Sequence, residues 1–178
     1  MTQHDLTEAR GLCAYIDDSP SPYHCVETTA HALEAAGFQE LLEVPEFNLF
    51  PLPTGVDAEI GAMTEPCAVA YHAVDRATIR AGMSAAVIGG GPIGNMVAQW
   101  LRIRGCRPVI VSEPDARKRT IAADMGFAVV DPDEAEPTIR IQEMTDGGAD
   151  VVVEACGLPA TFQQALASAS LFGQVVFL

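Results

Sequence analysis

The chain has 178 residues, of which 49% are hydrophobic, and its formal net charge at pH 7 is −14. This length and apolar content suffice for one domain of ordinary size with an appendage. The strong negative charge argues against nucleic acids and anionic membrane surfaces as partners, because clustered Lys and Arg side chains bind both. No apolar stretch is as long as a membrane span and the N-terminus lacks the pattern of a signal peptide, so we expect a cytoplasmic protein.

Acidic residues are distributed unevenly along the chain. Residues 1–50 carry nine acids and the single base Arg10, whereas residues 51–178 carry fifteen acids and nine bases. Pro51, Pro53 and Gly55 supply the rigid and flexible positions that are typical of a junction. The sequence therefore predicts two units, a small N-terminal segment over residues 1–50 and a domain over residues 51–178.

The first unit is predicted to be a helical hairpin. Leu6–Ile16 has a helical apolar pattern, and the prolines of Ser19–Pro22 end it. Ser21 then has the properties of an N-cap, with Pro22 at the first helical position, and Gly37 is a natural stop for the second helix. A hairpin of this size is too small to be a domain alone, so we expect it to pack on another surface.

The second unit alternates between predicted helices and strands. We expect helices over residues 58–74, 93–104, 115–125, 137–144 and 159–168, and strands over 85–88, 108–112, 127–130, 150–155 and 174–178. Strands such as Val151–Val153 are apolar on both faces, as in a parallel sheet that helices cover on each side. The predicted fold class is α/β, a doubly wound parallel Rossmann sheet truncated to about five of its usual six strands.

A glycine-rich sequence indicates the chemistry. Gly89-Gly90-Gly91-Pro92-Ile93-Gly94 follows one predicted strand and opens a helix. In a dinucleotide-binding fingerprint, Gly89 forms the tight turn, Gly91 lets the backbone approach a pyrophosphate, and Gly94 lets the helix pack closely on its strand. The helix N-terminus offers free N–H groups and a partial positive charge to the phosphates. The alternative is a glycine-rich turn that binds nothing.

Glu113 bears on the identity of the cofactor. It ends the next apolar run, nineteen positions after Gly94. A carboxylate at this point accepts hydrogen bonds from the adenosine ribose and repels a 2′-phosphate, so NAD(H) is favoured over NADP(H). Arg117, Lys118 and Arg119 follow closely and weaken that preference, although their simplest role is an exposed first helical turn.

Several stretches agree in order and spacing with one known family, namely Gly61–Val74, Val87–Gly94, Gly148–Gly157 and Gly173–Val176. From about residue 52 to residue 178, the chain resembles the nucleotide-binding half of the zinc-dependent medium-chain dehydrogenase/reductases, most nearly the sorbitol, threonine and related alcohol or polyol dehydrogenases. The resemblance implies that a pyrophosphate lies against Gly89, Gly91, Pro92, Ile93 and Gly94. It also implies that Glu113 binds the adenosine ribose, that Lys118 makes a nearby ribose or phosphate contact, and that Cys156 and Gly157 lie beside the cofactor.

The same resemblance raises the question of zinc. Glu65 matches a glutamate that approaches the catalytic zinc in this family, but one carboxylate cannot form such a site, and Glu65 is more simply a helix-capping acid. The catalytic domain that supplies the family's other zinc ligands is not found in the sequence. We therefore expect no catalytic residue and no bound zinc here. His24, His31 and His72 are candidates by residue type alone, and the five cysteines are expected to be reduced, mostly buried thiols.

The first unit resembles a different family. Residues 5–48, through Leu12–Val26 and Leu33–Phe38, are similar to the N-terminus of aspartyl aminopeptidases, but the metal-binding residues of that family have no counterpart in the chain. The simplest hypothesis is a fusion that binds NAD(H) with little turnover of its own. The alternatives are a dehydrogenase completed by a catalytic partner chain, a non-enzymatic interaction protein and an aminopeptidase fragment. The free edge of the fifth strand could also pair copies into a homo-oligomer.

Overall fold

The computed structural model describes residues 50–178, and Leu52–Leu178 form one compact unit. The predicted helical hairpin, the aminopeptidase-like stretch, His24 and His31 lie outside the described residues. Within the described part of the chain, no helix is both long enough and apolar enough to span a membrane. The cytoplasmic location stays a prediction.

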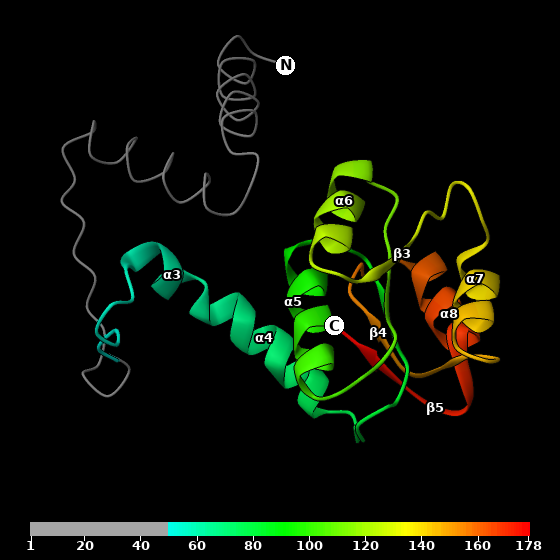
Figure 1. Ribbon diagram of the computed structural model, residues 1–178, viewed down its shortest axis with the longest axis horizontal. Coiled ribbons are helices and arrows are strands. Elements are labelled where there is room, and N and C mark those ends of the chain that lie inside the picture. The colour runs from blue at the N-terminus through cyan, green and yellow to red at the C-terminus, as the bar shows by residue number, and fades with distance from the viewer. Residues whose placement is uncertain (1–49) are drawn as a thin grey trace, which may run out of the picture. The chain divides into compact units, whose positions relative to one another are not determined.

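Helices and strands alternate along the described chain (Figure 1). In chain order they are α3 (Ala58–Ala62), α4 (Thr64–Asp75), β1 (Ala85–Ile88), α5 (Pro92–Ile103), β2 (Val109–Ser112), α6 (Ala116–Asp124), β3 (Ala128–Val130), α7 (Pro137–Met144), β4 (Ala149–Glu154), α8 (Pro159–Ser168) and β5 (Ala169–Phe177). The predicted α/β fold with five parallel strands is confirmed.

The five strands form one parallel sheet in the order β3-β2-β1-β4-β5. In the central strand, Ala85 pairs with Val109 of β2 on one side and with Val151 of β4 on the other. The chain therefore crosses over at β1, first toward β3 and then toward β5. Such a reversal opens a crevice at the carboxyl ends of the central strands, which is where open α/β sheets bind ligands.

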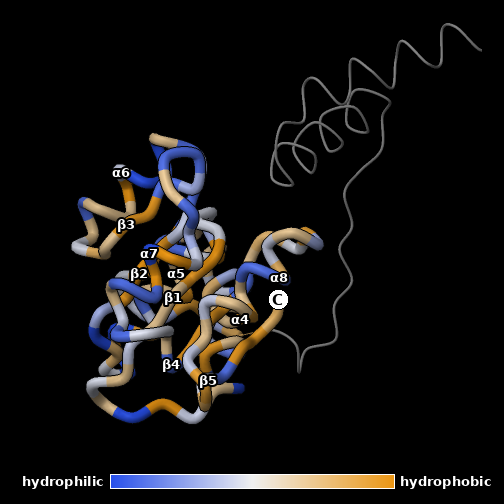
Figure 2. Tube along the Cα trace, turned by 90° about the vertical axis from the view of Figure 1, so that its right-hand side faces the viewer, coloured by the Kyte–Doolittle hydropathy of each residue, from blue (hydrophilic) through white to orange (hydrophobic). Residues whose placement is uncertain are grey.

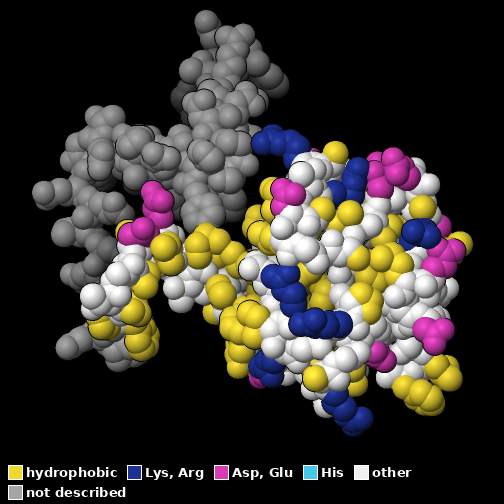
Figure 3. Space-filling model, viewed as in Figure 1, with side chains coloured by type: hydrophobic (Ala, Val, Ile, Leu, Met, Phe, Trp, Pro, Cys, Tyr) yellow, Lys and Arg dark blue, Asp and Glu magenta, His cyan; other side chains and the backbone are white. Residues whose placement is uncertain are grey.

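Both faces of the sheet are buried, which explains the apolar runs. Val87, Val111 and Val153 point toward the cluster that contains side chains of α4, α5 and α6, whereas Ile110 and Val152 point toward α7 and α8. In Figure 2 the central strands accordingly form a band of hydrophobic colour between the helices. Apolar side chains also remain exposed along α3 and α4 (Figure 3), namely Ile60, Met63, Val69 and Tyr71.

The helix predicted over residues 58–74 is two helices, interrupted at Met63. The reason is Pro66, which has no N–H and whose ring would collide with the carbonyl of Ala62 in a continuous helix. Pro66 instead occupies the first turn of α4, where its missing donor costs no helical hydrogen bond.

Strand β5 begins at Ala169 rather than at the predicted residue 174. Ala169 pairs with Ala149, and the register then shifts so that Gln174 pairs with Val151. The residues between them form a bulge, in which Leu171 and Phe172 are 90% and 93% exposed. β5 lies at one edge of the sheet, and pairing of copies through this edge stays a prediction.

Candidate functional site

The glycine-rich turn connects β1 directly to α5. Gly89 has a φ of +105°, a conformation that side chains disfavour, and a Cβ at this position would lie only 2.6 Å from Sγ of Cys156. Gly91 is the N-cap of α5, and Pro92 and Ile93 are its first two residues. Proline is well suited to this position because its fixed φ is helical and its missing N–H would have no helical partner.

Gly94 lies where α5 touches the turn. A Cβ at this position would be 1.8 Å from the carbonyl oxygen of Gly89 and 3.4 Å from Cγ1 of Val87 in β1. The N-terminus of α5 is therefore closer to the turn than any side chain at residue 94 would permit.

Gly91 faces open space. Apart from Gly91 itself and its two neighbours in the chain, no heavy atom lies within 4 Å of the position that a Cβ of Gly91 would occupy. The amides of Ile93 and Gly94, in the first turn of α5, have no carbonyl partner within the helix. Free amides at the positive end of a helix, beside open space, are the features by which helix N-termini bind phosphate groups.

Glu113 follows β2 and is only 5% exposed. One carboxylate oxygen accepts a hydrogen bond of 2.7 Å from the amide of Gly90, and the other accepts one of 2.9 Å from the amide of Asp115. Nζ of Lys118 lies 4.0 Å from the second oxygen. The carboxylate is thus held in a fixed position against the glycine-rich turn, and each oxygen retains a lone pair for a further donor.

Glu154 is a site residue that the sequence analysis missed. It ends β4 and is fully buried. One carboxylate oxygen accepts hydrogen bonds of 2.8 Å from the amide of Cys156, 3.1 Å from the amide of Gly157 and 2.8 Å from the hydroxyl of Thr161. Glu154 therefore fixes the turn after β4. The only signal for Glu154 in the sequence was its position as a single acid at the end of a predicted apolar strand.

Cys156 is not an activated nucleophile. Loss of water around its sulfur raises the pKa of the thiol, and the negative charges of Glu154 and Glu113 raise it further. Its thiol therefore stays protonated near neutral pH. Among the described cysteines, Cys106 is buried, Cys67 is half-buried and Cys156 is exposed, so the expectation of mostly buried thiols is wrong for this part of the chain.

The described residues do not assemble a zinc site around Glu65. Its carboxylate is in the first turn of α4 and is exposed, and His72 is exposed on the same helix. Within residues 50–178, no three His, Cys, Asp or Glu side chains are grouped closely enough to hold a metal ion. The residues of this part of the chain therefore do not fit a zinc ion.

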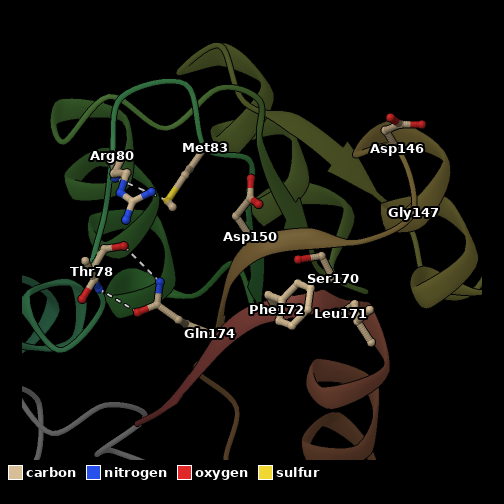
Figure 4. A pocket seen from close by; sticks show the side chains of 10 residues that line it. All are labelled: Thr78, Arg80, Met83, Asp146, Gly147, Asp150, Ser170, Leu171, Phe172 and Gln174. Atoms are coloured by element: carbon tan, nitrogen blue, oxygen red, sulfur yellow. Dashed lines mark hydrogen bonds between the residues drawn. The ribbon is translucent and has the colours of Figure 1, made fainter.

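A hollow of about 660 Å³ is shown in Figure 4. Its lining residues include Met83, which precedes β1, and Gly147, which precedes β4, so it lies at the amino ends of the strands, whereas the glycine-rich turn follows the carboxyl end of β1. At the border of the hollow, the side chain of Gln174 makes two hydrogen bonds with the backbone of Thr78. Oε1 of Gln174 accepts one of 2.8 Å from the Thr78 N–H, and Nε2 of Gln174 donates one of 3.0 Å to the Thr78 carbonyl oxygen. This pairing attaches the connection between α4 and β1 to the edge strand. The hollow is therefore separate from the glycine-rich turn at the carboxyl ends of the strands.

Comparisons with known proteins agree with this geometry. Residues 92–178 match the family model described as zinc-binding dehydrogenase. The chain is 38% identical over 141 residues to (R,R)-butanediol dehydrogenase of Bacillus subtilis, covering 79% of this chain and 41% of the relative. It is 32% identical over 160 residues to L-threonine 3-dehydrogenase of Pyrococcus furiosus, covering 88% of this chain and 46% of the relative.

A solved structure shares the fold over the same region. It is described as a zinc-binding dehydrogenase from Sinorhizobium meliloti 1021 bound to NADP, with a TM-score of 0.70, 35% identity and coverage of 75% of this chain and 40% of that one. The chain thus spans less than half the length of the proteins that it matches. It belongs to the zinc-dependent medium-chain dehydrogenases, and residues 52–178 correspond to the nucleotide-binding domain of that family.

Proposed function

We propose that residues 52–178 bind a nicotinamide dinucleotide across the carboxyl ends of β1, β2 and β4. The observation that carries this proposal is the open space at Gly91, beside the free amides of Ile93 and Gly94. The pyrophosphate occupies this space and accepts hydrogen bonds from those amides. Cys156 and Gly157, in the turn that Glu154 fixes, line the cofactor on the β4 side.

We further propose that the cofactor is NAD(H) rather than NADP(H). The supporting feature is Glu113, whose carboxylate is anchored by two backbone amides and so cannot easily swing away from a 2′-phosphate. At a separation near 4 Å, two unit charges repel by about 4 kcal/mol at the effective dielectric constant of a protein surface. The ribose of NAD(H) instead donates its hydroxyl protons to this carboxylate, and Lys118 contacts the ribose or a phosphate from the other side.

The reaction class that we propose is hydride transfer between an alcohol or polyol and the nicotinamide ring. In this reaction, residues 52–178 bind the cofactor and orient its nicotinamide ring. A catalytic domain that carries the metal site would supply the remaining groups, and the exposed apolar side chains of α3 and α4 are the contact surface that we propose for it.

A fluorescence titration tests the binding proposal. Wild-type protein should enhance NADH fluorescence in a saturable manner, and Gly91→Asp should abolish this effect because its carboxylate occupies the pyrophosphate space. Ala123→Asp adds the same charge at an exposed position of α6 and should bind NADH like the wild type. Equal binding by Gly91→Asp, or no binding by a folded wild-type chain, would contradict the proposal. If NADH binds, alcohol-dependent NADH formation after addition of a relative's catalytic domain, lost again with a chelator, tests the reaction class.

A further inference from the structure

An ion pair lies between the ends of β2 and β3, next to the residue proposed to bind the ribose. It joins Arg119 of α6 to Asp131, which follows β3. Their side chains are only 19% and 14% exposed, whereas the side chain of Lys118, one residue before Arg119, is 48% exposed. Of these two bases, Arg119 is the more buried.

The same guanidinium also contacts the backbone around Glu113. Nη1 of Arg119 donates a hydrogen bond of 2.9 Å to the carbonyl oxygen of Glu113, and it also donates to the carbonyl of Pro114. The amide of Glu113 in turn donates to the carbonyl of Val130 at 3.1 Å. Arg119 therefore contacts the backbone of Glu113, whose carboxylate is proposed to bind the ribose. The donors of its guanidinium, however, are directed at two backbone carbonyl oxygens and at Asp131.

We infer that Asp131 is a specificity-determining residue, which favours NAD(H) by keeping Arg119 away from the ribose 2′ position. Arginine is the side chain best suited to bind a phosphate group, because its planar fork of donors matches the phosphate oxygens. Without Asp131, Arg119 is a half-buried cation with no carboxylate partner, which is a costly state. A 2′-phosphate then supplies the missing negative charge. Its attraction to Arg119 offsets its repulsion by Glu113.

The decisive variant is Asp131→Asn. It removes the charge but keeps the side-chain oxygen that accepts a 3.0 Å hydrogen bond from the amide of Asp133. We expect the ratio of the NADPH to the NADH dissociation constant to fall about tenfold, the effect of one charge-assisted hydrogen bond. Asp133→Asn removes an equal charge at an exposed position two residues away and should leave this ratio unchanged.

The double variant Asp131→Asn with Arg119→Met tests whether Arg119 causes the fall in the ratio of dissociation constants. If Arg119 binds the 2′-phosphate, the double variant should return the ratio to the wild-type value. An unchanged ratio in Asp131→Asn would overturn the inference, and so would an equal fall in the double variant or in Asp133→Asn. If the ion pair had a purely structural role, Asp131→Asn would weaken the binding of both cofactors equally and would leave the ratio of their dissociation constants unchanged.

The inference rests on the proposed cofactor site, but the two fail differently. Absence of NADH binding by the folded wild-type chain contradicts the proposed function, whereas wild-type binding with an unaltered ratio in Asp131→Asn contradicts only the role of Asp131. Thermal unfolding followed by circular dichroism shows whether each variant is folded. If Asp131→Asn does not fold, Asp131→Ser takes its place, because a serine hydroxyl can accept the same local hydrogen bond.

Discussion

Two glycine-to-alanine substitutions, three residues apart, should impair different properties. Gly94→Ala should lower the stability of the fold, and Gly91→Ala should weaken cofactor binding. Gly94→Ala places a methyl group 1.8 Å from the carbonyl oxygen of Gly89, so the start of α5 must move away from the turn. Gly91→Ala places the same group where no atom lies within 4 Å, so the free protein accommodates it. With cofactor bound, that methyl group competes with the pyrophosphate.

The magnitudes follow from these contacts. For Gly94→Ala, overpacking against a rigid backbone atom costs about 3 kcal/mol or more, and the better helix propensity of alanine returns only about 1 kcal/mol. A net loss of about 2 kcal/mol lowers the melting temperature of a domain of this size by roughly 5–10 °C. For Gly91→Ala, the loss is limited to the poorer N-capping of alanine, less than about 1 kcal/mol.

Thermal unfolding with and without NADH separates the two effects. Gly94→Ala should melt several degrees below the wild type even without cofactor. Gly91→Ala should melt within a few degrees of the wild type alone, but it should lack the rise in melting temperature that saturating NADH gives to the wild type. A wild-type melting temperature for Gly94→Ala, or an undiminished NADH-induced rise for Gly91→Ala, would refute this reasoning.

Three further predictions concern acidic groups and a thiol near the site. Glu154→Ala leaves the amides of Cys156 and Gly157 without their acceptor, so urea unfolding should show a loss of about 2 kcal/mol; unchanged stability would mean that water replaces the carboxylate. The raised pKa of the Cys156 thiol predicts slower alkylation by iodoacetamide at pH 8 than that of glutathione, followed by mass spectrometry of its peptide; equal rates would contradict the protonated state. Asp115 accepts hydrogen bonds from the amides of Lys118 and Arg117, and these bonds lower its pKa. Its charge therefore stabilises the fold above the ordinary aspartate pKa, and this contribution is lost as the pH falls through the lowered value. The stability difference between wild type and Asp115→Asn should accordingly vanish in acid, and a difference that grows in acid would reverse the sign of the argument.

Local signals in the sequence predicted most of the fold. The helices over residues 137–144 and 159–168 have the predicted bounds because each begins with a proline at its first position. The strand over 85–88 also matches, because glycines end a short apolar run. The interruption at Met63 was foreseeable from Pro66, whereas the early start of β5 was not. It depends on pairing between Ala169 and Ala149, which are distant in sequence.

The candidate site was less accessible to sequence reasoning, since its essential contacts join distant residues. The turn and Glu113 were predicted separately, but the hydrogen bond from the Gly90 amide to Glu113 spans 23 positions and gives no local signal. The pairing of Arg119 with Asp131 likewise depends on the adjacency of β2 and β3. In the sequence, Arg119 is one of three successive bases, and only its burial separates it from Lys118.

The most direct test of the account is an amide chemical-shift titration of the ¹⁵N-labelled chain with NADH. The account predicts that the largest shifts occur at the amides of Gly90, Gly91, Ile93 and Gly94, at Glu113 and at Cys156–Gly157, which follow the carboxyl ends of β1, β2 and β4. Thr78 and Gln174, beside the hollow at the opposite ends, should remain unchanged. Shifts that gather around Thr78 and Gln174, or no shifts at all in a folded chain at millimolar NADH, would contradict the proposal that the glycine-rich turn binds the cofactor.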